Sequence, residues 1–374
     1  MRVLHLVCSD RFAGVERHVA LLAGAQQEAG ATVAVIGGDE VPMRRDIGRD
    51  DVLFRPTGGL LQTIRTARPF VPGADVIHVH MTASEIAGVI AALGTRAAVV
   101  TTRHFADARG STPLNRWVGR RAASRIDAQI AVSAYAAQYV EGSSTVVHAG
   151  VRDRAPVEPG TRQNTVLVAQ RLEPEKRTDM ALDAFATSKL ANRGWVLVVA
   201  GGGSLRAALE RRAERLGIAR STRFLGHTTD VHDLMATAGL LLAPRPDEAY
   251  GLSVVEAMAA GLPVVAAGAG GHLETVGTVP GAALFPPDDA MAAGALLAEL
   301  AAGGGGHLET VGTVPGAALF PPGDVVAAGS TLADLAADEA ARAGYGESLR
   351  RAQRERFTLG AQQRATDHVY RGVL

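Results

Sequence analysis

The sequence predicts an α/β protein built of two tandem Rossmann-like domains, whose parallel sheets face a central cleft. The length of 374 residues exceeds what a single hydrophobic core usually holds. Short apolar runs alternate with longer stretches of helical periodicity, which is typical of a doubly wound parallel sheet. This rhythm restarts after a polar, Pro-rich stretch at 153–160, so we place the domain boundary there.

The first half of the chain predicts an N-terminal domain over residues 1–153. Its apolar runs are bounded by Gly, Asp or Pro, as the strands of a buried parallel sheet are. The expected strands are 3–7, 32–36, 76–79 and 98–101, and the expected helices lie near 15–29 and over 83–93.

The second half predicts a C-terminal domain over residues 154–355. The expected strands are 166–169, 195–200, 223–225, 239–243 and 263–267, and the expected helices are 178–190 and 204–216. Open sheets of this kind bind ligands outside the carboxyl ends of their strands, so we expect the functional residues there.

The composition excludes several classes of protein. Basic and acidic residues are equal in number, 38 of each, and give no net charge that would attract nucleic acid. Cys8 is the only cysteine, so no intrachain disulfide and no cysteine zinc site is expected, which fits a cytoplasmic protein. The apolar runs are too short to predict a signal peptide or a transmembrane helix.

One segment occurs twice. Residues 270–287 read GGHLETVGTVPGAALFPP, and the same 18 residues recur at 305–322, 35 positions later. Two copies are too few for a solenoid, so this is a local tandem duplication, and we expect one copy to be surplus. The first copy follows an expected strand directly and the second leads into the terminal helices, so the sequence leaves open which one occupies the native position.

The segment after the expected strand 239–243 carries candidate ligand-binding residues. Tyr250 and Gly251 predict a tight turn, and Ser253 with Glu256 predicts a Ser-x-x-Glu capping box at the start of a helix. The N–H groups and the positive dipole end of a helix start suit a diphosphate.

Glu248 and Glu256 flank this helix start, so both carboxylates are candidates to contact hydroxyl groups of one ligand. An isolated Ser-x-x-Glu pattern favours a plainer interpretation, a helix cap beside a solvated loop acid. The longer run Glu248-x-Tyr-Gly-x-x-x-x-Glu256-Ala-x-Ala-x-Gly-x-Pro-Val-Val resembles the signature of the family 4 glycosyltransferases, which are retaining enzymes of the GT-B fold. This resemblance covers nearly the whole chain apart from the duplication, and it favours a ligand site.

A second segment resembles the same family. Gln170-Arg171-Leu-Glu-Pro-Glu-Lys176-Arg177 is similar to the family segment Gly-Arg-Leu-x-x-x-Lys-Gly. The resemblance implies that Arg171 and Lys176 hold the phosphates of the donor, where a guanidinium grips and an ammonium neutralises the developing charge. A solvated charge at a helix start is the alternative for Lys176, although the chain has only one other lysine, Lys189.

Two loops match the family more weakly. Gly226 and His227, in Phe-Leu-Gly-His, resemble the loop that lies near the nucleobase in relatives. Gly14 lies in a run that resembles the loop near the diphosphate, although Ala13 replaces the first of the usual pair of glycines.

Three histidines lie at strand ends. His104 follows the strand at 98–101 and matches a position where relatives often carry a histidine facing the donor sugar, while a structural role is the alternative. His78 and His80 alternate on the strand at 76–79. We interpret His78 as structural and leave His80 open.

A basic stretch follows these histidines. It is expected to form a helix after residues 111–113 and contains Arg103, Arg109, Arg116, Arg120, Arg121, Arg125 and Trp117. A solvated helix face is the favoured interpretation, and docking on an anionic membrane or a phosphorylated acceptor is the alternative.

The resemblance implies transfer of a hexose, with retention, from a nucleoside diphosphate sugar to an acceptor hydroxyl or amine. Glu248 would orient the sugar, and Glu256 would bind the ribose hydroxyls beside a nucleobase loop at Gly226 and His227. The catalytic candidates are Glu248, His104, Arg171 and Lys176, and the donor- and diphosphate-binding candidates are Gly14, Arg171, Lys176, Tyr250, Gly251, Leu252 and Ser253.

The resemblance also implies no cofactor and no metal, because cationic side chains take the place of a metal. A UDP-hexose is favoured as the co-substrate, with a GDP-hexose as the alternative. The acceptor would be a small molecule or a glycolipid in natural-product, glycolipid or cell-envelope biosynthesis, with membrane contact at most peripheral. The segment 356–374 is expected to form a helix that returns to the N-terminal domain.

Two other functions remain open from the sequence. The duplication lies directly after the expected donor loop at 270–274, so displacement of that loop would leave a catalytically impaired sugar-nucleotide-binding protein. A sugar-nucleotide epimerase of the GT-B fold is ranked below it, because such a protein should lack the Glu248 and Glu256 signature.

Overall fold

The computed structural model describes residues 1–109, 119–155, 157, 160–228, 231–279, 282–302 and 339–374. The chain divides into two compact units, one formed by Met1–Val151 with Phe357–Leu374 and the other by Arg152–Arg356. These bounds lie within two residues of the expected ones, and each unit is described by itself below.

The first unit holds, within the described residues, a parallel sheet of seven strands in the order β3-β2-β1-β4-β5-β6-β7. The strands are β1 (Arg2–Val7), β2 (Thr32–Ile36), β3 (Leu53–Arg55), β4 (Val76–His80), β5 (Ala98–Arg103), β6 (Ala128–Ala131) and β7 (Thr145–Val146). The helices are α1 (Gly14–Glu28), α2 (Glu40–Ile47), α3 (Leu60–Ala67), α4 (Thr82–Ala92), α6 (Ala134–Ala137) and α15 (Leu359–Arg371). The sequence did not reveal β3, β6 and β7, because runs of two to four residues carry too little apolar periodicity.

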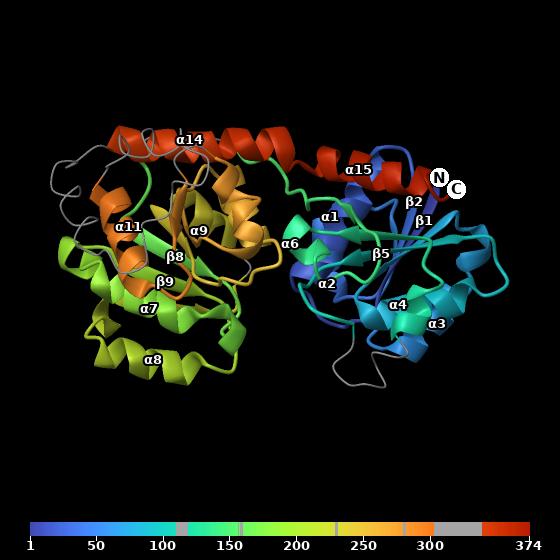
Figure 1. The fold of residues 1–374 in the computed structure, drawn as a ribbon, viewed down its shortest axis with the longest axis horizontal. Coiled ribbons are helices and arrows are strands. Elements are labelled where there is room, and N and C mark those ends of the chain that lie inside the picture. The colour runs from blue at the N-terminus through green and yellow to red at the C-terminus, as the bar shows by residue number, and fades with distance from the viewer. Residues whose placement is uncertain (110–118, 156, 158–159, 229–230, 280–281, 303–338) are drawn as a thin grey trace. The chain divides into compact units, whose positions relative to one another are not determined.

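Helix α15 completes the core of the first unit although it lies more than 200 residues from the rest of that unit in sequence. It packs against α1 (Figure 1). Tyr370 on α15 is fully buried and lies in one apolar cluster with Val3, Val76 and Val100. Three neighbouring strands therefore bury part of their apolar surface against the C-terminal helix.

The second unit holds, within the described residues, a parallel sheet of six strands in the order β10-β9-β8-β11-β12-β13. The strands are β8 (Thr165–Ala169), β9 (Val196–Ala200), β10 (Thr222–Gly226), β11 (Leu240–Ala243), β12 (Val264–Ala267) and β13 (Ala283–Phe285). The helices are α7 (Thr178–Thr187), α8 (Arg206–Arg215), α9 (Val231–Thr237), α10 (Leu252–Ala259), α11 (Ala290–Ala302) and α14 (Glu339–Arg356). Helices α7 and α8 lie on one side of this sheet and α14 on the other (Figure 1). The prediction of two parallel, doubly wound α/β units is confirmed.

The first copy of the duplicated segment forms the edge of this sheet. It contains the short 3-10 helices η5 (Gly270–Leu273) and η6 (Val276–Thr278) and strand β13, whose residues Ala283 to Phe285 pair with Val265 to Ala267 of β12. Residues 270–287, with 280 and 281 excepted, therefore occupy the position that follows β12. The second copy, 305–322, lies outside the described residues.

The longest described helix, α14, has 18 residues and is rich in arginine, which gives its outer surface a polar character. Across the described ranges, the chain contains no helix with both the length and the apolar composition that crossing a bilayer requires.

Candidate active site

The predicted donor-site charges of the second unit lie together. The Nζ atom of Lys176, at the end of the 3-10 helix η2 (Pro174–Lys176), donates a hydrogen bond to Oε2 of Glu248 at 2.7 Å. Arg245 lies 3.9 Å from the same oxygen and also pairs with Asp247 at 2.9 Å. Lys176 and Glu248 thus join the loop after β8 to the loop after β11, at the carboxyl ends of two neighbouring strands.

The electrostatics of this cluster keep Glu248 ionised. Burial acts to raise the pKa of the Glu248 carboxyl, but the charges of Lys176 and Arg245 outweigh burial, and the pKa lies below its usual range. His272 acts in the same direction from a second loop. A carboxylate held in this way can accept hydrogen bonds from the hydroxyl groups of a ligand.

The loop that carries Lys176 is fixed by its own first residue. Gln170, at the end of β8, donates from its side-chain amide to the carbonyl of Lys176 at 2.7 Å and to Oγ1 of Thr178 at 3.0 Å. Glu173 accepts from the backbone N–H and from the hydroxyl of Ser204, which ties this loop to the turn after β9. Lys176 is therefore positioned by two neighbouring loops.

Within the described residues, Arg171 makes no hydrogen bond or ion pair with Lys176 or Glu248. Its side chain is exposed and pairs with Glu175 at 2.9 Å, four residues along the chain. Exposed pairs of this kind contribute little to stability, so the guanidinium can exchange its partner for an anion at low cost.

The helix start after Glu248 is built differently from the expectation. Gly251, with φ +85°, occupies the N-cap position, and α10 begins at Leu252 without a side-chain cap. Ser253 and Glu256 thus fall inside the helix, and the predicted capping box is wrong. The left-handed conformation of Gly251 explains this, because it starts the helix two residues earlier than a Ser253 cap would.

This helix start still offers hydrogen-bond donors. The N–H groups of Val254 and Val255 bond to the carbonyl of Gly251. Those of Leu252 and Ser253 have no such partner among the described residues, as is normal in the first turn of a helix. Together with the dipole of α10, they suit an anion.

The first copy of the duplicated segment supports the Glu248 loop from behind. The N–H of Gly271 donates to the carbonyl of Glu248 at 2.7 Å. A Cβ on Gly270, whose φ is +58°, would lie 2.7 Å from the same carbonyl oxygen, and a Cβ on Gly271 would lie 2.6 Å from that of Ala249. The two glycines are therefore needed for this close approach, and the loop is in place despite the duplication.

The remaining candidate residues of the second unit differ in solvent exposure. Tyr250 is buried, and burial raises the pKa of its hydroxyl well above the usual range. Glu256 is buried on α10. Gly226 ends β10 with φ +74° and accepts from the N–H of Gly201, and His227 follows it on the surface.

In the first unit, Gly14 is the first residue of α1. The buried Glu16 accepts from the N–H of Ala13 at 2.9 Å and so stabilises this helix start. A Cβ on Gly14 would meet no protein atom within 4 Å, so the packing of this unit does not itself require glycine there.

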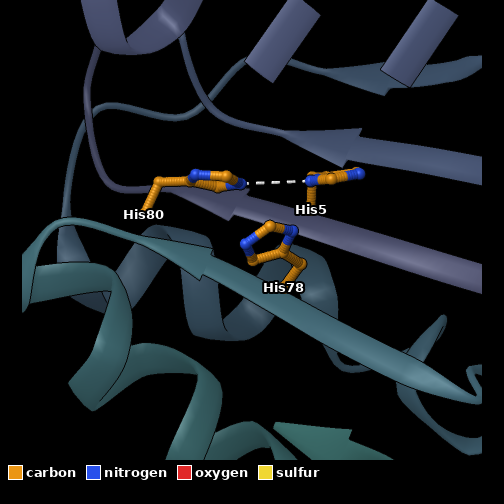
Figure 2. Close-up of side chains that lie close together, drawn as sticks. All are labelled: His5, His78 and His80. Atoms are coloured by element: carbon orange, nitrogen blue, oxygen red, sulfur yellow. Dashed lines mark hydrogen bonds between the residues drawn. The ribbon is translucent and has the colours of Figure 1, made fainter. Parts of the chain in front are cut away.

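His104 follows β5 and is part of a larger histidine cluster, consisting of His5, His18, His78, His80 and His104. Figure 2 shows His5 and His80 linked by a hydrogen bond, with His78 beside them. His78 is fully buried between the hydroxyls of Tyr370 and Thr102, each at 2.6 Å, as its structural interpretation predicts. Burial is the main cause that lowers the pKa of all five imidazoles, to about 4 for His5 and about 3 for His18.

This cluster is the place where a metal ion would find imidazole ligands. Two groups, His5 with His78 and His80, and His18 with His80 and His104, each bring their ring nitrogens within 4.8 Å of one another. However, both nitrogens of His5, His78 and His80 already have hydrogen-bond partners. A metal would have to displace several of these bonds.

The sequence did not identify His5 or His18 as part of a cluster with His104. The signal that could have revealed the cluster is strand register. His78 and His80 are two residues apart on β4 and so lie on the same face, and His5 of β1 pairs directly with His78. The polar residues that complete the cluster from α15 lie too far along the chain for any local pattern to reveal.

The interpretation of the basic stretch as a solvated helix face is wrong for its first part. Arg109 is 1% exposed and donates from Nε to Oε2 of Glu85 at 2.8 Å, and Arg103 is also buried beside Glu85. Glu85 is fully buried on α4 and needs cationic partners there, which accounts for the burial of both arginines. Arg116 and Trp117 lie outside the described residues.

Two family descriptions match adjacent parts of the chain. Residues 12–153 match Glycosyltransferase Family 4, and residues 152–312 match Glycosyl transferases group 1. The two matches meet at the boundary between the units.

Curated relatives match over shorter stretches. A GDP-mannose-dependent alpha-(1-6)-phosphatidylinositol dimannoside mannosyltransferase of Mycobacterium tuberculosis is 43% identical over 95 residues, 25% of each chain. The D-inositol 3-phosphate glycosyltransferase of Mycobacterium bovis is 33% identical over 236 residues, 53% of this chain and 48% of the relative. The chain thus spans between a quarter and a half of the length of these relatives.

Solved structures share the fold over the full length. The Anabaena protein HepE in complex with UDP is similar with a TM-score of 0.75 and 18% identity, covering 100% of both chains. The pneumococcal O-GlcNAc transferase GtfA in complex with UDP and GlcNAc has a TM-score of 0.69 and 12% identity, covering 100% of this chain and 99% of that chain. At these identities the similarity concerns the fold alone.

Proposed function

The chain belongs to glycosyltransferase family 4, and we propose that it is a retaining, metal-independent hexosyltransferase that uses a nucleoside diphosphate hexose. The observation that carries this proposal is the hydrogen bond between Lys176 and Glu248 beside the start of α10. It places a cation, a carboxylate and free helix N–H groups in one cluster, which matches the phosphates and the hydroxyl groups of such a donor.

The diphosphate would take the cationic part of the cluster. Lys176 neutralises the charge that develops as the sugar departs, Arg171 gives up its exposed bond to Glu175, and the first N–H groups of α10 add the helix dipole. Because Lys176 and the first turn of α10 are fixed before the donor binds, little reorganisation of these groups is needed during the reaction.

The carboxylates would take the hydroxyl groups. Glu248 is held ionised by Lys176 and Arg245, and it orients the hexose by accepting from its hydroxyls. Glu256 would accept from the ribose hydroxyls, next to a nucleobase loop at Gly226 and His227. His104, partly buried at the end of β5, would contact the donor sugar.

The base of the donor has two candidates. We keep a UDP-hexose in first place and a GDP-hexose as the alternative, which the name of the mannosyltransferase from Mycobacterium tuberculosis supports for that relative. The acceptor would be a hydroxyl or amine of a small molecule or a glycolipid, as the names of the two mycobacterial relatives illustrate for those proteins.

The decisive experiment is a thermal-shift panel of UDP, GDP, ADP and dTDP and their hexose conjugates, first with a chelator and then with magnesium. A ligand at 100 times its dissociation constant stabilises a protein by about 2.7 kcal/mol, which such a panel resolves. We expect one base to stabilise the protein in the presence of the chelator. Release of nucleoside diphosphate from that donor, with retention at the anomeric carbon by NMR, then tests the transfer.

Two results would overturn the proposal. Stabilisation only with magnesium would exclude metal independence, and no stabilisation by any nucleotide would exclude the donor site. Binding without turnover of any donor would favour the impaired binder. The hypothesis of an impaired binder depends on displacement of the loop at 270–274. The contacts of Gly270 and Gly271 with the Glu248 loop do not support such a displacement.

A further inference from the structure

A continuous row of hydrogen bonds runs from helix α15 through the sheet of the first unit to His104. Nε2 of His5 lies 2.8 Å from Oε1 of Gln26, and Nδ1 of His5 lies 3.1 Å from Nε2 of His80. Nδ1 of His80 in turn lies 3.1 Å from Nε2 of His104. Figure 2 shows the central step, in which the imidazoles of His5 and His80 face each other end to end.

The buried end of this row has a fixed direction. The side-chain amide of Gln26 donates to Oδ1 of Asp367 on α15 at 3.1 Å. Oδ2 of the same carboxylate accepts from Gln363 at 2.6 Å. An ionised carboxylate only accepts hydrogen bonds, so the NH₂ group of Gln26 must face Asp367, and its oxygen must face His5.

This direction determines every tautomer along the row. His5 must donate from Nε2 to the oxygen of Gln26, so its Nδ1 is an acceptor. His80 must then donate from Nε2, which makes its own Nδ1 an acceptor for Nε2–H of His104. His104 is left with an unprotonated Nδ1, and this nitrogen has no partner among the described residues.

We propose that Asp367 and Gln26 are positioning residues that fix His104 as the Nε2–H tautomer, so that its Nδ1 accepts a hydrogen bond from a hydroxyl of the donor hexose. This inference rests on the proposed function, because it supplies the chemistry by which His104 contacts the sugar. The C-terminal helix thereby acts on His104 through the buried side chains of Gln26, His5 and His80.

The protonation state of the row agrees with this arrangement. Burial, together with the mutual repulsion of the histidines, holds the pKa of His80 and His104 well below the usual range, so both rings are neutral near pH 7. Neutral rings carry one donor and one acceptor each, which a row of single hydrogen bonds requires.

A zinc ion on His5, His78 and His80 is the competing use of the same side chains. It would need the Nδ1 or Nε2 atoms that now bond to Gln26, Tyr370, Thr102 and the other imidazoles. The existing bonds occupy both nitrogens of all three rings, so a zinc ion would have to displace them.

The test measures the tautomers directly. In the full-length protein labelled with ¹⁵N-histidine, long-range ¹H–¹⁵N spectra distinguish protonated from unprotonated ring nitrogens, and His104→Gln assigns the signals of His104. We expect His104 to show a single Nε2–H form in the wild type. In Asp367→Asn, the side-chain amide of Gln26 and the new amide at position 367 can both rotate by half a turn. We therefore expect His104 to become a mixture of both tautomers.

Thr102→Val is the matched control. It removes a buried hydrogen bond to His78 in the same layer, but it leaves the row from Gln26 to His104 intact. We expect the His104 spectrum to stay unchanged in this variant. An Nδ1–H form of His104 in the wild type, or an unchanged spectrum in Asp367→Asn, would overturn the proposal, as would a shift of the ring signals on addition of zinc that shows all three rings bound to it.

Kinetics separate this proposal from the proposed function. With a turned-over donor, Asp367→Asn should raise KM for the donor by about two- to threefold, because only the fraction of His104 that keeps the Nε2–H tautomer can accept the hydroxyl, while Thr102→Val should not. An unchanged KM in Asp367→Asn despite mixed tautomers would overturn the role in sugar binding. If no donor is turned over, the proposed function fails, whereas the tautomer spectra still decide whether the row of hydrogen bonds fixes the tautomer of His104.

Discussion

The Nζ atom of Lys176 lies 2.7 Å from Oε2 of Glu248, and the two side chains are only 16% and 19% exposed. Each of these charges therefore holds the other in place before any ligand binds. A donor that binds here exchanges one charge-assisted hydrogen bond for another, so the cost of desolvating Lys176 has already been met in the folded protein.

Replacing Lys176 with alanine should weaken binding of the nucleoside diphosphate by about 10- to 100-fold, because a hydrogen bond to a charged group is lost. Isothermal calorimetry with the nucleotide identified by the thermal-shift panel measures this change. Lys189→Ala is the matched control, because Lys189 is the other lysine of the chain and is exposed. Equal affinities of the two variants would contradict the assignment of Lys176 to the phosphates.

The sequence predicted the fold because its signals are local. Five-residue strands such as Thr165–Ala169 and Val196–Ala200 give apolar runs, and the helices between them have their own periodicity. The loops after β8 and β11 were found for the same reason, since Lys176 and Glu248 each lie in a recognisable segment. The hydrogen bond between them joins residues 72 positions apart, and only the fold reveals it.

The histidine cluster shows where such signals end. Gln26 and Asp367 are separated by 341 residues, and neither lies in a motif. The prediction of the helix cap was wrong for a different reason. Ser253 and Glu256 fit the pattern of a capping box, but Gly251 adopts a left-handed conformation and is itself the N-cap of α10. A local pattern cannot decide between two adjacent helix starts when the flanking loop sets the conformation.

Gly251 and Gly14 should respond differently to alanine. Gly251→Ala should lower the free energy of unfolding by about 1–2 kcal/mol, because φ is +85° and the new Cβ would lie 3.1 Å from Cδ2 of His272. Gly14→Ala should leave stability unchanged or slightly higher, because its Cβ meets no atom within 4 Å. Urea unfolding of both variants measures the difference.

The activity of the two variants then tests the proposed role of Gly14. If the diphosphate approaches the backbone there, Gly14→Ala should weaken donor binding by about tenfold or more without loss of stability. A fully active and stable Gly14→Ala variant would remove Gly14 from the donor site.

The histidine cluster should make the first unit sensitive to acid. The folded pKa values of His5 and His18, about 4 and about 3, lie below the usual value of 6.5. Between these values the unfolded chain binds more protons than the folded one. The contribution of these histidines to the free energy of unfolding is therefore complete above pH 6.5, and it is lost as the pH drops toward 4. The slope reaches about 1.4 kcal/mol per pH unit for each such histidine.

Urea unfolding followed by circular dichroism at pH 7.5, 6.5 and 5.5 measures this dependence. His18→Gln should reduce the slope by the contribution of about one proton, whereas His368→Gln, which changes an exposed histidine of the same unit, should leave it unchanged. A slope that His18→Gln does not alter would mean that His18 is not the buried neutral group described above.

Removal of one copy of the duplicated segment should leave a folded protein. The likeness of the two copies extends past the 18 identical residues, because Ala293, Gly294 and Leu297 of α11 have Ala, Gly and Leu again 35 positions later. These are the positions that pack: Ala293 and Leu297 are fully buried, and a Cβ on Gly294 would lie 2.6 Å from the carbonyl oxygen of Ala184 on α7. The second sequence therefore carries the residues that this position requires.

Two deletions of 35 residues test this. Deletion of 303–337 keeps α11 itself, and deletion of 288–322 joins residue 287 of the first copy to residue 323, which follows the second copy. Near the junction of the first deletion, Arg342 of α14 donates to the carbonyl of Ala301 of α11 at 3.1 Å. We expect both shortened chains to unfold cooperatively and to keep the nucleotide-induced thermal shift, since Gly270 and Gly271 still support the Glu248 loop in each.

The pair of deletions also distinguishes interchangeable copies from a single competent one. If only the chain that retains α11 folds, the second copy lacks something that the shared Ala, Gly and Leu do not supply, and the first copy alone is native. If neither folds, the second copy is required by the fold and is not surplus. If both fold and bind the nucleotide equally, the two copies compete for one position beside β12, and the duplication adds length without changing the donor site.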